Sequence, residues 1–375
     1  MSSLTLALLA IAQARFLGVQ DRGMVVLLLS ISGSCSILGS LGYGLSRIGT
    51  PFVTLNMAEI KNHLFLSNLL SQLSLLLLSF SHEGLVNLIN SIFIAISTTS
   101  LTSMFLVLDI TLSSYHSLKI RISIYLLSLI EFFSVVLLGF INKLTLTNTI
   151  LISSTAALIN ILALILIIHD KVDTKSEKSS GLFFGWQYMV TYLATYQFIY
   201  LYRLPASFVI SPSDIANLTV AFSLALIGMP FIYHISQYLK VSTMTYQKIV
   251  LRQKRNLVMS FSLLVVYSLT LAICSKIIIE ITVGKDFYAA ADLLRWIMLG
   301  LPFFAILVFY RSAKEGIVGK PDLFGNITYL GACTLGIVLS GIIGGVLSIC
   351  IFFSIWHLIL GSLAGFKLIK LFSNR

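Results

Sequence analysis

The stretch from residue 183 to residue 202 carries aromatic hydroxyl groups at regular intervals. Every fourth position is a tyrosine, and two threonines fall on the same side: Tyr188, Thr191, Tyr192, Thr195, Tyr196 and Tyr200. On a helix these positions share one face. A tyrosine hydroxyl facing lipid would lose its hydrogen bonds, so we expect this face to point inward. It could line an aqueous cavity for sugars, because tyrosine combines a flat ring with a hydroxyl. The alternative is that the tyrosines bond to neighbouring helices.

A carboxylate lies near the middle of the apolar stretch 120–141. Glu131 would sit deep in a membrane, where an ionisable group is costly and usually has a function. We expect it to couple transport to a proton or another cation. Two alternatives remain open: a protonated or ion-paired structural residue, or stretch boundaries that differ from those drawn.

A second polar stripe runs along residues 85–108. Asn87 and Thr98 belong to it, and Asp109 follows at its end. We interpret Asn87 and Thr98 as further cavity lining and Asp109 as a second coupling residue. Threonine and serine in membrane helices often only bond across helix contacts, and Asp109 could simply be solvated near the cytoplasmic surface.

The composition identifies the solvent in which these residues act. Hydrophobic residues make up 57% of 375 and charged residues 10%, and the mean hydropathy is +0.97. Soluble domains carry about 25% charged residues, so this chain is expected to lie in a bilayer. The net charge of +11 could indicate nucleic acid or basic cytoplasmic loops, and the positions of the charges decide between the two.

The apolar residues fall into about twelve stretches. We predict spans at 2–14, 24–46, 64–80, 85–108, 120–141, 146–168, 183–202, 214–235, 257–280, 289–310, 323–341 and 344–366. The first offers only about fourteen residues, or about 21 Å of helix, against about 30 Å of hydrocarbon. We expect a truncated first helix, whether the chain begins partway into it or a short helix thins the membrane.

The basic residues divide unequally between the two sides of this arrangement. Eighteen of the 25 Lys and Arg residues fall on the side that also holds both termini. The positive-inside rule makes this the cytoplasmic side, which explains the net charge without nucleic acid. A polar segment at 169–182 is interpreted as a cytoplasmic linker. It separates residues 1–168 from residues 183–375, two six-helix bundles with the same orientation, as in transporters built from parallel repeats.

The sequence lacks the short motifs of nucleotide hydrolysis, metalloproteases and thiol or metal sites. The chain has no GxxxxGK[ST], HExxH or CxxC sequence and no clustered acid pair. We therefore predict a protein that is not an enzyme and that has neither a metal site nor a cofactor.

Three segments carry a resemblance to a known family. "ARFLGVQDRGMVVLLLSISGSCSILGSLGYG" resembles the opening motif of the O-antigen (lipopolysaccharide) flippases, although Val19 replaces the usual proline. "RLPASFVISPSDIANLTVAFSLA" resembles the segment after their seventh helix. "ITVGKDFYAAADLLRWIMLGLPFFAILVFYRSAKEGIVGKPD" is similar to their region from helix nine to helix eleven. That family belongs to the multidrug/oligosaccharidyl-lipid/polysaccharide exporter superfamily.

The resemblance implies a fold, a cargo and a location. It implies two six-helix bundles around a central cavity in the bacterial inner membrane. They would move an undecaprenyl-diphosphate-linked oligosaccharide between the leaflets by alternating access. The implied partners are this lipid-linked substrate, membrane lipids and other polysaccharide-assembly membrane proteins.

Arginine suits the diphosphate of such a cargo, because its planar guanidinium binds phosphate with two hydrogen bonds. The candidates are Arg15, Arg203, Arg22, Arg47, Arg295 and Arg311. Arg15 and Arg203 come first, because one matches the motif and the other ends the tyrosine row. Each arginine could instead reach the membrane surface with its charged end.

Two rival functions stay open. An exporter of drug-like cations in the same superfamily would need a cavity dominated by acids. A membrane-embedded polysaccharide polymerase typically carries a large outer loop, which the span assignment does not leave room for.

Overall fold

The computed structural model describes residues 2–41, 57–81, 94–104, 118–168, 186–195, 198–246, 251–319 and 322–373. These ranges are all-α and contain no strand. The long helices of the N-terminal part are α1 (Ser2–Leu17), α2 (Val19–Ser40), α3 (Met57–Ser81), α5 (Leu118–Phe140) and α6 (Leu146–Ile168). The predicted helical class is therefore confirmed.

The rest of the chain is helical as well. Its helices are α7 (Trp186–Thr195), α8 (Phe198–Ser207), α9 (Pro212–Ala225), α10 (Met229–Tyr246), α11 (Leu251–Ile273), α12 (Ser275–Thr282), α13 (Tyr288–Val318) and α14 (Leu323–Ser373). Short 3-10 turns at Leu226–Gly228 and Lys285–Phe287 precede α10 and α13.

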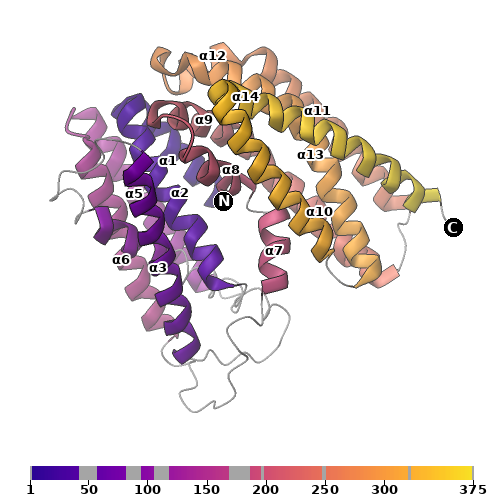
Figure 1. The fold of residues 1–375 in the computed structure, drawn as a ribbon, viewed down its shortest axis with the longest axis horizontal. Coiled ribbons are helices and arrows are strands. Elements are labelled where there is room, and N and C mark those ends of the chain that lie inside the picture. Colours follow the sequence, from indigo (N-terminus) through magenta and orange to yellow (C-terminus); the bar gives the residue numbers. More distant parts are fainter. Residues whose placement is uncertain are drawn as a thin grey trace.

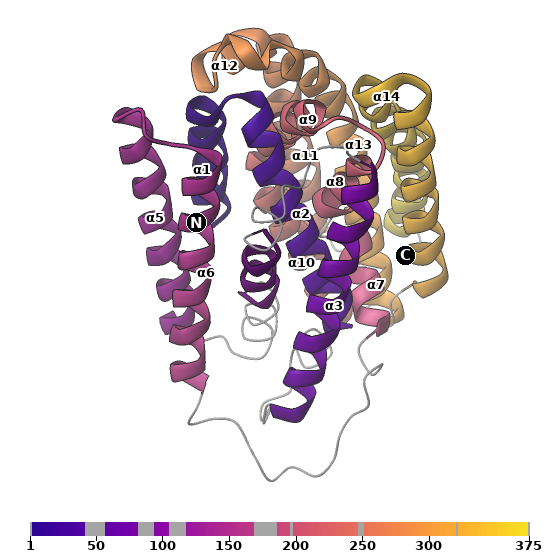
Figure 2. The same ribbon diagram turned by 60° about the vertical axis from the view of Figure 1, so that its left-hand side comes forward.

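The helices form two groups that meet at one end. Figure 1 shows α1, α2, α3, α5 and α6 on one side and α10, α11, α13 and α14 on the other. The groups come together near α9 and α12 and diverge towards the opposite end. Figure 2, turned by 60°, shows α5 and α6 side by side at one edge and α14 at the other.

The helix α9 occupies the junction between the two groups. It packs against α1 and α2 on one side and against α13 on the other, and every residue from Ile215 to Ala225 is buried. Beside it, Phe222, Tyr202 and Phe353 bring α9, α8 and α14 together, with ring centroids 5.3–5.8 Å apart. The predicted division at residues 169–182 lies outside the described residues.

The long helix α14 is a hairpin. Its helical backbone is interrupted at Gly344 and Gly345, and Gly345 has φ 66°, a conformation that favours glycine. Tyr329 bonds to His357 across the turn, so the two arms run antiparallel. The interruption takes up the first two residues of the predicted span 344–366, directly after the predicted gap at 342–343.

Two other helix boundaries differ from the sequence prediction. The predicted span 257–280 is divided at Cys274 into α11 and the short α12, whose charged residues Lys276 and Glu280 are exposed. The predicted span 289–310 continues to Val318 as α13. Arg311 and Glu315 can lie inside this helix because each has a polar partner on another helix.

Four described helices are long and apolar enough to cross a membrane: Val19–Ser40, Lys254–Ile273, Lys285–Val318 and Leu323–Leu371. The pair Pro212–Gly228 and Phe231–Thr245, bent by 47°, makes a fifth if it is one span. These helices identify a membrane protein, and the count of twelve spans stays a prediction.

Candidate functional site

Two glycines, one between α1 and α2 and one within α2, allow the close packing of this part of the chain. Gly18 lies between the helices with φ 74°, which a residue with a side chain adopts only under strain. Gly23 lies in the first turns of α2, directly against α9. A Cβ there would collide with the backbone carbonyl of Pro212. The adjacent residue Arg22 therefore lies where α1 and α2 pack against α9.

Arg22 is buried among the helices rather than exposed at the membrane surface. Its side chain is almost inaccessible, at 3% relative exposure, and its Nη1 donates a hydrogen bond to Oε1 of Gln13 on α1. Its charge interacts with those of Arg203 on α8 and Glu131 on α5. Four helices thus contribute to this cluster: α1 with Gln13, α5 with Glu131, and α2 and α8 with one arginine each.

The acid of this cluster has a defined partner. Oε1 of Glu131 accepts a hydrogen bond from the hydroxyl of Ser153 on α6, at 2.6 Å. The sequence identified Glu131 and Arg22 separately, and the structure places them within electrostatic reach. The sequence analysis did not select Gln13 or Ser153. The signal for Gln13 was an amide in an apolar helix two positions before Arg15.

Arg15 and Arg295 both bind the short helix α12. Nη1 of Arg15 donates to the carbonyl oxygens of Ile281, at 2.9 Å, and Thr282, at 3.5 Å. These carbonyls form the negative end of the α12 dipole. Nε of Arg295 bonds to Oγ of Ser275 at the start of α12, at 2.9 Å. Arg15 therefore connects α1 to the C-terminal helices, and its contact with a diphosphate stays a prediction.

A second buried cluster lies between α13 and α14. The guanidinium of Arg311 stacks over the ring of Tyr329, 4.2 Å from its centroid, and Nη1 donates to the carbonyl of Ala194 on α7 at 3.2 Å. Nδ1 of His357 lies 2.8 Å from the carbonyl of Phe353 and carries the proton, since a carbonyl only accepts. Nε2 then accepts from the Tyr329 hydroxyl at 2.9 Å.

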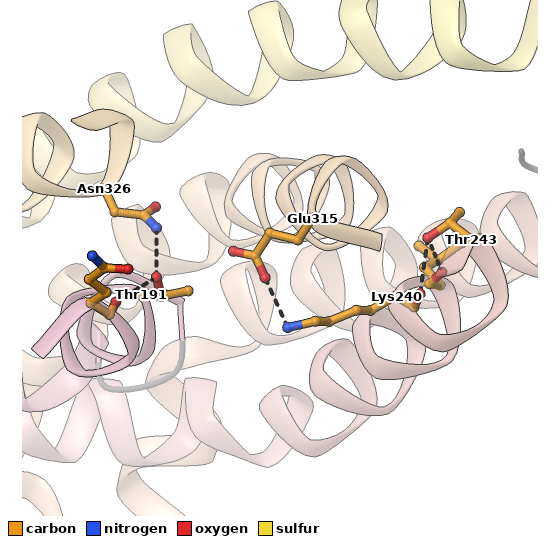
Figure 3. A network of polar contacts seen from close by, with 7 residues as sticks. Thr191, Lys240, Thr243, Glu315 and Asn326 are labelled. Carbon is orange, nitrogen blue, oxygen red and sulfur yellow. Dashed lines mark hydrogen bonds and ion pairs between the residues drawn. The ribbon is translucent and has the colours of Figure 1, made fainter. Parts of the chain in front are cut away.

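Further polar contacts hold α7 and α10 to the same helices. Figure 3 shows Asn326 on α14 donating to the hydroxyl of Thr191 on α7, at 3.2 Å. It also shows the ion pair between Lys240 on α10 and Glu315 on α13, at 3.0 Å. Thr191 thus bonds to a neighbouring helix, and its predicted cavity-lining role stays a prediction.

The remaining predicted residues divide into two sets. Thr98 is buried, and its carbonyl accepts a hydrogen bond from Ser32 on α2 at 3.5 Å. No side-chain position is described for the others, so their predicted roles lie outside the described residues: Arg47, Asn87, Asp109, Tyr188, Tyr192, Thr195, Tyr196 and Tyr200.

Comparison with known proteins bears on the fold. No protein-family profile matches this chain, and no curated protein does. A solved structure is similar: a multidrug resistance MATE family transporter of the MOP superfamily in an inward-facing conformation. The TM-score is 0.68 at 12% identity, over 99% of this chain and 94% of the other. The chain is thus an all-helical membrane protein with the fold of a MATE transporter.

Proposed function

We propose that this protein is a flippase that moves an undecaprenyl-diphosphate-linked oligosaccharide across the bacterial inner membrane by alternating access. One observation carries the proposal. Arg22 and Arg203 come from the two predicted halves, and near the junction the charge of Arg22 interacts with that of Arg203 and with that of Glu131. An anionic group there can contact both halves at once, so that movement of the halves carries it across.

The charges of the site favour a diphosphate. Arginine binds phosphate through charge-assisted hydrogen bonds that are roughly twice as strong as neutral ones. Arg22 is buried, so a phosphate group that reached it would be bound with little competition from water. The likeness of the fold to an inward-facing transporter and the resemblance to O-antigen flippases support the same function. Other polysaccharide-assembly membrane proteins are the proposed partners.

Flipping by purified protein in vesicles tests this proposal. The assay measures how much fluorescent lipid-diphosphate oligosaccharide reaches the opposite leaflet. We expect Arg22→Gln and Arg203→Gln each to lower the rate at least about tenfold, the effect of losing one charge-assisted hydrogen bond of about 1.5 kcal/mol. Lys276→Gln removes an exposed positive charge from α12 and serves as the matched control. Normal flipping by both arginine variants at equal protein content would overturn the proposal.

Export of drug-like cations is the second candidate. The similar structure is that of a multidrug resistance transporter, and Glu131 supplies an acid inside the bundle. The same vesicles, loaded with a cationic dye in place of the lipid, separate the two functions. Dye export that requires Glu131, together with no lipid flipping, would establish this candidate and exclude the first.

A further inference from the structure

Three isoleucines at the end of α11 and along α12 form an exposed apolar row. Ile273, Ile277 and Ile281 are 77%, 62% and 69% exposed. They follow one another at intervals of four residues, which places them on one face of a helix. This face continues across the break at Cys274, because the N–H of Ile278 still donates to the Cys274 carbonyl, at 2.9 Å. The isoleucine row, as these three residues are called below, therefore extends an exposed face of α11 onto α12.

Charged residues lie beside the isoleucine row on α12. Lys276 and Glu280 each precede a member of the row by one position, and both are exposed. Glu280 accepts a hydrogen bond from the hydroxyl of Tyr288, at 2.7 Å, and forms an ion pair with Lys285, at 3.4 Å. On the remaining side of α12, Ile279 is buried against the rest of the protein. The outward surface of α12 is thus apolar along one half and charged along the other.

The length of α11 indicates the depth at which α12 lies. The apolar part of α11, Lys254–Ile273, has 20 residues. That is about 30 Å of helix, which equals the thickness of the hydrocarbon core of a bilayer. Since Lys254 and Arg255 mark one surface, the other surface falls close to Ile273. The helix α12 begins two residues later, and Figure 2 shows it at one extreme end of the helix bundle.

Neither hydrocarbon nor water alone suits the surface of α12. In hydrocarbon, the exposed charges of Lys276 and Glu280 would be strongly unfavourable. In water, the isoleucine row would leave three large apolar side chains in contact with solvent. A helix with an apolar side and a charged side instead lies in the plane of the membrane interface. Its small size is no obstacle, because α11 and α13 hold it at both ends.

We infer that α12 binds the phospholipid surface at which α11 ends. The isoleucine row lies against the acyl chains, and Lys276 and Glu280 lie among the headgroups, where a lysine reaches phosphate with its charged end. Tyr288 suits the same zone, since tyrosine is enriched at membrane interfaces. Arg15 donates to the carbonyl of Ile281 at the end of α12, so the lipid surface sets the depth of the helix to which α1 is attached. This placement is independent of the cargo.

Spin labels on the protein in vesicles of phosphatidylethanolamine and phosphatidylglycerol test this inference. Each label is attached to a single new cysteine in a Cys274→Ser background, because the other three native cysteines are buried. Electron paramagnetic resonance then measures how often the label collides with oxygen, which concentrates in lipid, and with a nickel chelate, which stays in water. The labelled variants are Ile277→Cys, Ile281→Cys and the matched neighbour Lys276→Cys. Val266→Cys, at an exposed position within α11, is the lipid reference, and Asp286→Cys is the water reference.

The expected pattern changes sharply between neighbouring residues. We expect the oxygen-to-nickel collision ratio of Ile277→Cys and Ile281→Cys to approach that of Val266→Cys. The ratio of Lys276→Cys, one position away, should be severalfold lower and close to that of Asp286→Cys. Two isoleucine positions are measured so that one remains decisive if the other variant does not fold.

Three results would overturn the inference. Ratios at the isoleucine positions equal to that of Asp286→Cys would place the row in water. Rare collisions with both reagents would show that protein, such as a second copy of the chain, covers the row in place of lipid. A ratio at Lys276→Cys as high as that at Val266→Cys would place all of α12 within the hydrocarbon.

Discussion

The two buried polar clusters of this protein differ in how completely their groups are satisfied. Between α13 and α14, Arg311 has both an aromatic face and a carbonyl, and both ring nitrogens of His357 are bonded. Between α1 and α2, Arg22 and Gln13 are bonded to each other but retain donors without acceptors.

This difference teaches what each cluster does. A fully bonded polar network in a low-dielectric interior strengthens itself and makes one arrangement rigid. The α13–α14 cluster therefore acts as a frame that holds α7 and the hairpin together. A partly bonded network costs stability unless a ligand completes it. We propose the Gln13–Arg22 cluster as the place where the diphosphate of the cargo binds, and the substitutions below test the division between frame and binding site.

The largest effect is expected at the core of the frame. Phe353 is fully buried and packs against Tyr202, Phe222 and His357. Phe353→Ala should lower the free energy of unfolding by about 3–5 kcal/mol through the cavity that it leaves. The measurement is thermal unfolding of the purified protein. Phe324→Ala is the matched control: Phe324 lies on the same helix α14 but is 83% exposed, so its loss should change the free energy of unfolding little. Equal effects of the two would show that this region is not a frame.

A smaller effect is expected where the two groups of helices meet. Gly23→Ala places a methyl group against the backbone of Pro212, so α2 and α9 must separate. We expect the free energy of unfolding to fall by about 1–3 kcal/mol, as for other overpacked contacts, and lipid flipping to slow, because Arg22 moves with α2. Gly331→Ala is the control, since a Cβ there meets nothing within 4 Å. Unchanged unfolding and flipping in Gly23→Ala would separate Arg22 from this contact.

The smallest effect concerns an ion pair at the edge of the frame. Lys314 lies 2.6 Å from Asp322, and its hydrogen bond holds the pKa of Asp322 below the ordinary value. A carboxyl with a lowered pKa stabilises the protein above its unfolded pKa of about 4, and this contribution disappears as the pH falls through the folded value.

Asp322→Asn should therefore lower stability at pH 7 and have no effect once the wild-type carboxyl is protonated. The loss should stay under about 1 kcal/mol, because the two side chains are 40% and 42% exposed. Unfolding of the two proteins between pH 3 and pH 7 measures it. A difference that grows towards low pH would contradict the assignment.

A functional residue could be identified from the sequence where the free-energy cost of burying it depends only on the surrounding stretch of chain. Glu131 was apparent because a carboxylate in an apolar stretch is expensive whatever its neighbours are. Arg22 was one of six arginines selected for the diphosphate, but its burial could not be foreseen. Burial depends on the contact of Gly23 with Pro212, which lies far along the chain. The sequence analysis did not select Gln13 for the same reason: an amide near a helix end gains a role only through its spatial partner, here Arg22.

The sequence alone determined the helical class, the membrane environment and the division of residues 323–366 into two helical stretches. Hydropathy and glycine conformation depend on neighbours along the chain, so a single sequence reveals them. Only the tertiary structure decided that Arg15 binds α12 and that Arg22 lies within electrostatic reach of Glu131 and Arg203. Those contacts join residues far apart in sequence, and they follow from how the helices pack, which local patterns do not specify.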